Sequence, residues 1–95
     1  MMITLHSKLQ PSPQAIYTRL SEDEGVLLHL DTKRYYTLNE TGSVIWNHLD
    51  KGLSLAEVAG KLQLEYEVEI QQAQNSVLRL AQELNQEKLV ELCGE

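Results

Sequence analysis

A single cysteine and the absence of long apolar runs set the first limits on this chain of 95 residues. Cys93 has no partner within the chain, which excludes an internal disulfide and fits a reducing cytosol. The N-terminal segment has no long apolar core and no small-residue cleavage site, so we predict no signal peptide. No apolar run approaches the ~20 residues that span a bilayer. We therefore expect a cytoplasmic protein without a membrane partner.

Basic residues are also few. The chain has 8 Lys and Arg residues against 14 Asp and Glu residues, which gives a formal net charge of −6. Proteins that bind nucleic acids or anionic membranes need a basic patch, whereas here the acidic residues are spread along the whole chain. The charge balance therefore argues against both kinds of partner.

Residue types that commonly perform catalysis or hold metals show no useful pattern. His6, His29 and His48 share no metal-ligand spacing with one another or with Cys93. The chain has no glycine-rich phosphate-binding loop and no nucleophile elbow. We expect His29 on the outer face of a hairpin and His48 on the polar side of a helix, with both side chains solvated. The sequence thus predicts no enzyme, no metal and no cofactor.

Two short runs of strand-forming residues, Val26–Leu30 and Arg34–Leu38, are separated by a polar interval. Alternating Val, Leu and Tyr residues around such an interval predict a β-hairpin. A turn with Lys33 in the left-handed region pairs Leu28 with Tyr36. This register gathers the even-numbered apolar side chains of both strands on one face, so we prefer it.

The segment before the hairpin divides into two parts. We predict a flexible N-terminal arm over residues 1–14, because Pro11 and Pro13 prevent regular strand pairing. Ala15–Leu20 alternates in polarity and predicts a first strand, so the sheet is a three-stranded antiparallel meander. A chain of this length forms one domain, which we expect to cover residues 15–92.

Start and stop signals define three helices after the meander. Asn39 is a good N-cap for the first helix, and Gly52 ends it. Ser54 and Glu57 form the capping box of the second helix. The third helix covers residues 70–86, where apolar residues recur at helical spacing in a wide stripe.

Three strands followed by three helices predict an α+β fold of the winged-helix type, and this order favours two binding functions. DNA binding needs several basic residues on a recognition helix, but the third helix offers Arg79 alone, beside Glu83 and Glu87. The alternative is capture of a peptide on the open edge of Arg34–Leu38, where main-chain groups supply affinity. The pattern alone is equally compatible with an edge that is simply exposed or covered by the N-terminal arm.

One set of residues resembles a known family. The segment YYTLNETGSVIW (residues 35–46) is followed by the helix start at Ser54, by Tyr66 in a connector and by a long helix. Over residues 15–92 this set is similar to the PqqD-like family, the recognition elements of pathways that make ribosomally synthesised and post-translationally modified peptides. The chain departs from the family pattern at Lys33, where many members carry Gly.

The resemblance implies a winged-helix-like fold and a mode of binding. The leader segment of a precursor peptide is expected to add as a strand to the third strand and to lie in a groove beside the third helix. The expected peptide-binding residues are Arg34, Tyr35, Tyr36, Thr37 and Leu38 on the strand, and Gln74, Leu78, Arg79, Ala81, Gln82 and Asn85 on the helix.

The resemblance also implies partners. As a small free-standing protein, the chain is most similar to the leader-binding subunit of lasso-peptide pathways, which serves a leader peptidase and then a cyclase. The pyrroloquinoline quinone pathway member, which serves a radical-SAM enzyme, is the first alternative. A degenerate winged-helix DNA-binding regulator is the alternative from another class. We therefore expect a non-catalytic protein that binds a leader peptide and presents it to a leader peptidase or another modifying enzyme.

Overall fold

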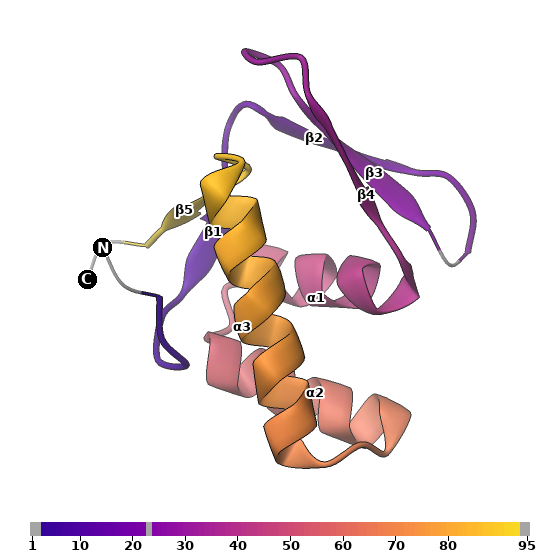
Figure 1. Ribbon diagram of the computed structural model, residues 1–95, viewed down its shortest axis with the longest axis vertical. Helices are drawn as coiled ribbons and strands as arrows, with labels where there is room; N and C mark the ends of the chain where they lie inside the picture. The colour runs from indigo at the N-terminus through magenta and orange to yellow at the C-terminus, as the bar shows by residue number, and fades with distance from the viewer. Residues whose placement is uncertain (1–2, 23, 94–95) are drawn as a thin grey trace.

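The computed structural model describes residues 3–22 and 24–93 and places a three-stranded antiparallel sheet before three helices (Figure 1). The strand order is β2-β3-β4, with bounds Ala15–Arg19, Gly25–His29 and Tyr35–Leu38. The helices are α1 (Glu40–Asp50), α2 (Leu55–Tyr66) and α3 (Ile70–Gln86). The predicted α+β order of three strands followed by three helices is confirmed.

A second, smaller sheet joins segments from the two ends of the described chain. Strand β1 (Leu9–Pro11) pairs antiparallel with β5 (Val90–Leu92). Leu9 is fully buried, so the core extends into the segment before residue 15. The expected flexible arm is therefore corrected for residues 3–14, because an apolar side chain and a strand partner hold this segment in place. Residues 1–2 lie outside the described residues.

The register between β3 and β4 differs by one residue from the predicted one. Leu27 pairs with Tyr36, whereas the pattern predicted Leu28 at this position. Because side chains alternate along a strand, the shift turns the odd-numbered residues of β3 inward and its even-numbered apolar residues outward. The loop of residues 30–33 absorbs the difference, and Lys33 has the predicted left-handed backbone, with φ 65°.

His29 organises this loop. It is only 5% exposed, and its Nδ1 accepts hydrogen bonds from the backbone amides of Asp31 and Thr32, each at 3.2 Å. Its carbonyl oxygen accepts from the amide of Lys33 at 2.8 Å. The prediction of a solvated His29 on the outer face is therefore wrong, because the ring is needed inside to satisfy the backbone of the turn.

The helix ends follow the predicted capping signals. The Oδ1 atom of Asn39 accepts from the amide of Gly42 at 2.8 Å at the start of α1. Ser54 and Glu57 form the reciprocal capping box of α2, with bonds of 3.2 Å and 2.8 Å. Gly52 follows α1 with φ 86°, a conformation that glycine adopts without strain. Local signals thus fix the boundaries of these helices.

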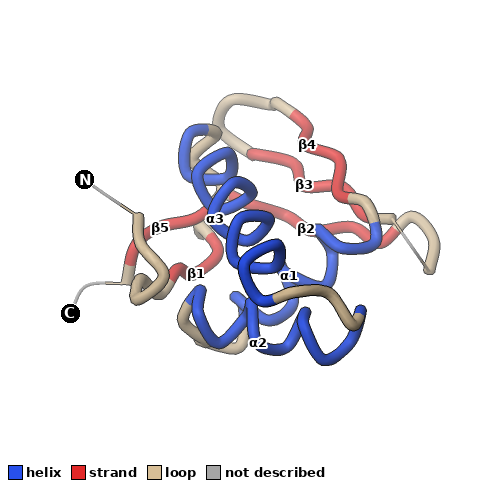
Figure 2. Tube along the Cα trace, turned by 60° about the horizontal axis from the view of Figure 1, so that its bottom comes forward, coloured by secondary structure: helices blue, strands red, loops and turns tan. Residues whose placement is uncertain are grey.

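The core lies between the three-stranded sheet and the helices, which gather to one side of it (Figure 2). Trp46 of α1 is buried and stacks on Tyr17 of β2, with ring centroids 6.4 Å apart. None of the described helices is long and apolar enough to cross a bilayer. The packing leaves β4, the last strand of the sheet, beside α3 (Figure 1).

Candidate functional site

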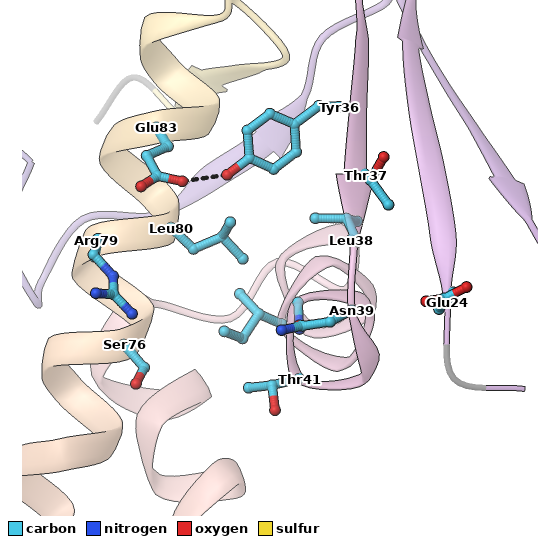
Figure 3. Close-up of a pocket in the computed structure, with 12 residues that line it drawn as sticks. Glu24, Tyr36, Thr37, Leu38, Asn39, Thr41, Ser76, Arg79, Leu80 and Glu83 are labelled. Atoms are coloured by element: carbon cyan, nitrogen blue, oxygen red, sulfur yellow. Dashed lines mark hydrogen bonds between the residues drawn. The ribbon is translucent and has the colours of Figure 1, made fainter.

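A cleft of about 520 Å³ lies between β4 and α3. It has a sheet edge as one wall and a helix as the other, with the start of α1 beneath (Figure 3). The residues that line it are Tyr36, Thr37 and Leu38 of β4, Asn39, Thr41, Gly42 and Ile45 around the start of α1, Ser76, Arg79, Leu80 and Glu83 of α3, and Glu24 just before β3.

The main chain of β4 is open on the side of the cleft. In an antiparallel ladder, residues alternate between those whose amide and carbonyl face the neighbouring strand and those whose groups face away. The amide of His29 donates to the carbonyl of Arg34 at 3.0 Å, which identifies Arg34, and with it Tyr36, as residues that face β3. The amides and carbonyls of Tyr35 and Thr37 therefore point to the open edge, where no other described strand pairs with them.

Two contacts at one end of the cleft connect β4 and the residue before it to α3 and its C-cap residue. The Tyr36 hydroxyl donates a hydrogen bond to the Glu83 carboxylate (Figure 3). One helical turn further along, Arg34 Nε lies 3.5 Å from Glu87 Oε1. Burial of the phenol, followed by its bond to Glu83, raises the pKa of Tyr36 to about 12, so this donor keeps its proton at neutral pH. We call these two contacts the clasp.

Away from the clasp, the cleft combines an apolar floor with a polar end. Leu38 and Ile45 are almost completely buried at its base, and the side chain of Leu80 projects from α3 toward them (Figure 3). Thr41 and Ser76 place hydroxyl groups at the end opposite the clasp. An extended peptide laid along β4 would therefore meet apolar side chains with one face and hydrogen-bonding groups at one end.

The charged side chains of the cleft differ in whether they have a partner. Glu83 accepts the bond from Tyr36, while Glu24 lies at the far side of β4 (Figure 3). Arg79 is exposed, and within the described residues it makes no ion pair. The cleft thus offers one guanidinium to an incoming carboxylate, and its Glu83 becomes available to a donor only if the clasp opens.

On the strand side, the structure brings the predicted peptide-binding residues together. Tyr36, Thr37 and Leu38 line the cleft directly. Arg34 adjoins it through the clasp, and Tyr35 contributes main-chain groups to the same open edge. The strand residues of the predicted site therefore lie together along the cleft and its open edge.

On the helix side, only Arg79 of the predicted residues lines the cleft. The remaining five lie away from it and are Gln74, Leu78, Ala81, Gln82 and Asn85. Ala81 is fully buried within the core and Leu78 packs against the core half-buried. The predicted groove wall of Leu78 and Ala81 therefore does not line this cleft, because the opposite flank of α3 faces β4.

The residues of that opposite flank were not among the predicted site residues. Ser76, Leu80 and Glu83 are spaced by four and three residues, so they form one face of α3. Leu80 carried a signal as part of the wide apolar stripe. Glu83 carried none, because its partner Tyr36 lies 47 residues earlier in the chain.

Outside the cleft, the titratable residues that the structure describes give no second candidate site. His48 is half-buried, with Nε2 3.2 Å from the Glu65 carboxylate, which corrects the expectation of a solvated ring. Over residues 3–22 and 24–93, no group of three or more His, Cys, Asp and Glu residues is placed to hold a metal ion.

Comparisons with known proteins give matches to a family and to solved structures. The family described as coenzyme PQQ synthesis protein D (PqqD) matches residues 24–90. No curated protein sequence matches the chain.

Two solved structures are similar to the chain over most of its length. One is TbiB1 in complex with the TbiA(beta) leader peptide, at 28% identity and a TM-score of 0.81, covering 90% of this chain and 99% of that chain. The other is lasso peptide synthetase B1 complexed with the leader peptide, at 28% identity and a TM-score of 0.80, covering 88% and 98%. The family match spans the hairpin, the helices and the cleft, and it confirms the resemblance found in the sequence: the chain belongs to the PqqD family.

Proposed function

We propose that this protein binds the leader segment of a ribosomally made precursor peptide by adding it as a strand to the free edge of β4. The observation that supports this most directly is the open main-chain edge at Tyr35 and Thr37, which lies beside the cleft between β4 and α3. The two similar structures are leader-peptide complexes, which supports the same class of ligand.

In the cleft, main-chain groups and side chains have different roles in peptide affinity and selectivity. Main-chain groups of Tyr35 and Thr37 pair with the peptide backbone and supply affinity without selecting side chains. Alternate peptide side chains point inward to Leu38 and Leu80, which favours apolar residues at these positions. Arg79 on the rim pairs with an acidic peptide residue, and such rim contacts act more on the association rate than on affinity.

The protein performs no chemistry on the peptide in this proposal. It acts as an adaptor that presents the peptide to a modifying enzyme, a leader peptidase followed by a cyclase in a lasso-peptide pathway. The alternative is a radical-SAM enzyme, as in pathways of the family's namesake. We place this step in the cytoplasm, which the lone cysteine of the chain suits.

The experiment is titration of a fluorescently labelled leader peptide, taken from the precursor gene next to the gene for this chain. Thr37→Pro removes an amide that faces the open edge and leaves the β3–β4 ladder intact. It should weaken binding about tenfold or more, as expected when a peptide carbonyl loses its donor. Thr37→Val keeps the amide and serves as the matched control, with binding unchanged. Equal affinity of both variants would contradict docking on this edge.

A second pair of variants tests which flank of α3 faces the peptide. Leu80→Glu places an unpaired charge on the apolar floor of the cleft and should weaken binding at least about tenfold. Leu78→Glu introduces the same change on the flank turned away from the cleft and should leave binding unchanged, with thermal melts used to compare folding. A stronger effect at Leu78 would place the peptide on the other side of α3.

A further inference from the structure

The outer face of the three-stranded sheet, turned away from the helices, is mostly apolar, with Gln14 and Glu24 as its polar residues beyond the strand ends. The register places side chains from all three strands on this face, and Leu20 and Leu30 continue the alternation just past the strand ends. Ile16 is 44% exposed, Leu20 59% and Tyr35 71%. The apolar residues of this outer face are Ile16, Leu20, Val26, Leu28, Leu30 and Tyr35.

This pattern is unusual for a sheet that is covered on one side only. An antiparallel sheet with a solvated face normally carries polar residues there, opposite an apolar inner face. Here the inner face is already apolar, with Leu27 and Leu38 fully buried, and within the bounds of the three strands the outer face adds only threonines to its apolar residues. Contiguous exposed apolar surface of this kind marks an interaction site, whereas a single exposed residue such as Leu64 needs no explanation.

The size of the outer face limits what covers it. Its six apolar residues and two threonines are far fewer than the roughly 20–30 residues that each partner contributes to a stable protein–protein interface. A second copy of the chain stacked on this face alone would therefore lack the contact area of a stable dimer. A partner must extend onto neighbouring surface, and the neighbouring surface is the edge of β4, because Thr37 belongs both to the outer face and to the lining of the cleft.

We propose that the outer face of β2–β3–β4 is the docking surface for the enzyme that modifies the bound peptide. This rests on the proposed function, since a strand added to β4 widens the same face by one strand. The enzyme then contacts the chain and the peptide together, which explains how it acts on bound peptide. Its contacting surface is apolar and uncharged, with basic residues around it that complement the net charge of −6 and the exposed Glu22 and Glu24 in the loop beside the face.

The test measures peptide binding and enzyme association separately. The probes are the labelled leader peptide and the peptide-modifying enzyme encoded in the same gene cluster. Ile16→Glu lies on β2, two strands away from the docking edge, and Leu20→Glu gives a second charge on the same face in case the first variant folds poorly. Leu64→Glu is the matched control, because Leu64 is 79% exposed and lies on α2.

We expect both outer-face variants to bind leader peptide within about twofold of the unmodified protein. Their association with the enzyme in the presence of the peptide should fall about tenfold or more, as for loss of a central interface residue. Leu64→Glu should change neither measurement. Unchanged enzyme association in Ile16→Glu and Leu20→Glu would overturn the proposal, as would a wild-type dimer, detected by light scattering, that these variants dissociate. If the unmodified protein does not bind the leader peptide, the proposed function is refuted instead.

Discussion

Replacing Tyr36 with Phe removes one hydroxyl from the clasp and leaves the aromatic ring in place. The hydroxyl donates to the Glu83 carboxylate and so connects β4 to α3. Because the acceptor is charged, the bond belongs to the stronger class, worth ~1.5–3 kcal/mol when shielded from water. The contact lies at the surface, so solvent screening reduces this figure, and we expect Tyr36→Phe to lower the free energy of unfolding by ~1 kcal/mol at neutral pH.

The pH dependence of this difference follows from the raised pKa of Tyr36. The pKa of the hydroxyl is near its ordinary value of 10.0 in the unfolded chain and about 12 in the folded chain, chiefly because of burial and secondly because of the bond to Glu83. A group whose pKa is higher in the folded state stabilises that state at all pH values below the unfolded pKa. The stabilisation is then lost as the pH rises through the folded pKa. The difference between wild type and Tyr36→Phe should therefore be constant up to about pH 10 and shrink toward pH 12.

The assay is urea unfolding of both proteins at pH 7, 9 and 11, followed by far-UV circular dichroism. Comparing the two proteins at each pH removes the contribution of lysines, which titrate in the same alkaline range. Tyr35→Phe is the matched control, since Tyr35 is exposed on the outer face, and its free energy of unfolding should match that of wild type. Equal stability of Tyr36→Phe and wild type at pH 7, or a difference that grows above pH 10, would refute the role assigned to the clasp.

Two further predictions concern stability. Trp46→Ala removes a buried ring that stacks on Tyr17 and should lower the free energy of unfolding by about 3–5 kcal/mol, whereas an unchanged thermal melt would show that the ring adds little to the core. Ser54→Ala removes the N-cap of α2 and should cost about 1 kcal/mol in chemical denaturation, with Ser54→Thr as the variant that retains most of the stability.

The features that the sequence predicted well are those that local chemistry determines. Asn39, Ser54 and Gly52 act on backbone groups only a few residues away, so the signals for the helix ends are complete within short segments. The family resemblance likewise depends on a continuous run of residues around β4 and α1. The strand half of the candidate site was predictable for the same reason, because an edge strand carries its own main-chain groups.

The register of β3 and the packing of the first residues depended on distant partners. The predicted and the observed hairpin registers each place apolar residues inward. The observed register also buries the ring of His29, a residue that hydrophobic patterning assigns to solvent. The burial of Leu9 depends on the pairing of its strand with residues near the C-terminal end, which no local signal predicts. Alternation of apolar residues specifies a register only when one face is polar, and β3 has apolar residues on both.

The same double-sided pattern links this register to the outer face of the sheet. Had β3 paired in the predicted register, Leu28 would be buried and the exposed side of the strand would carry His29 and be more polar. In the observed register Leu28 faces outward between Ile16 on β2 and Tyr35 on β4, in one row across the sheet. An apolar row on the solvent side of the sheet removes the alternation of apolar and polar residues that would specify the strand register. We therefore attribute this retention to a function of the outer face, beside the edge where we propose that the peptide docks.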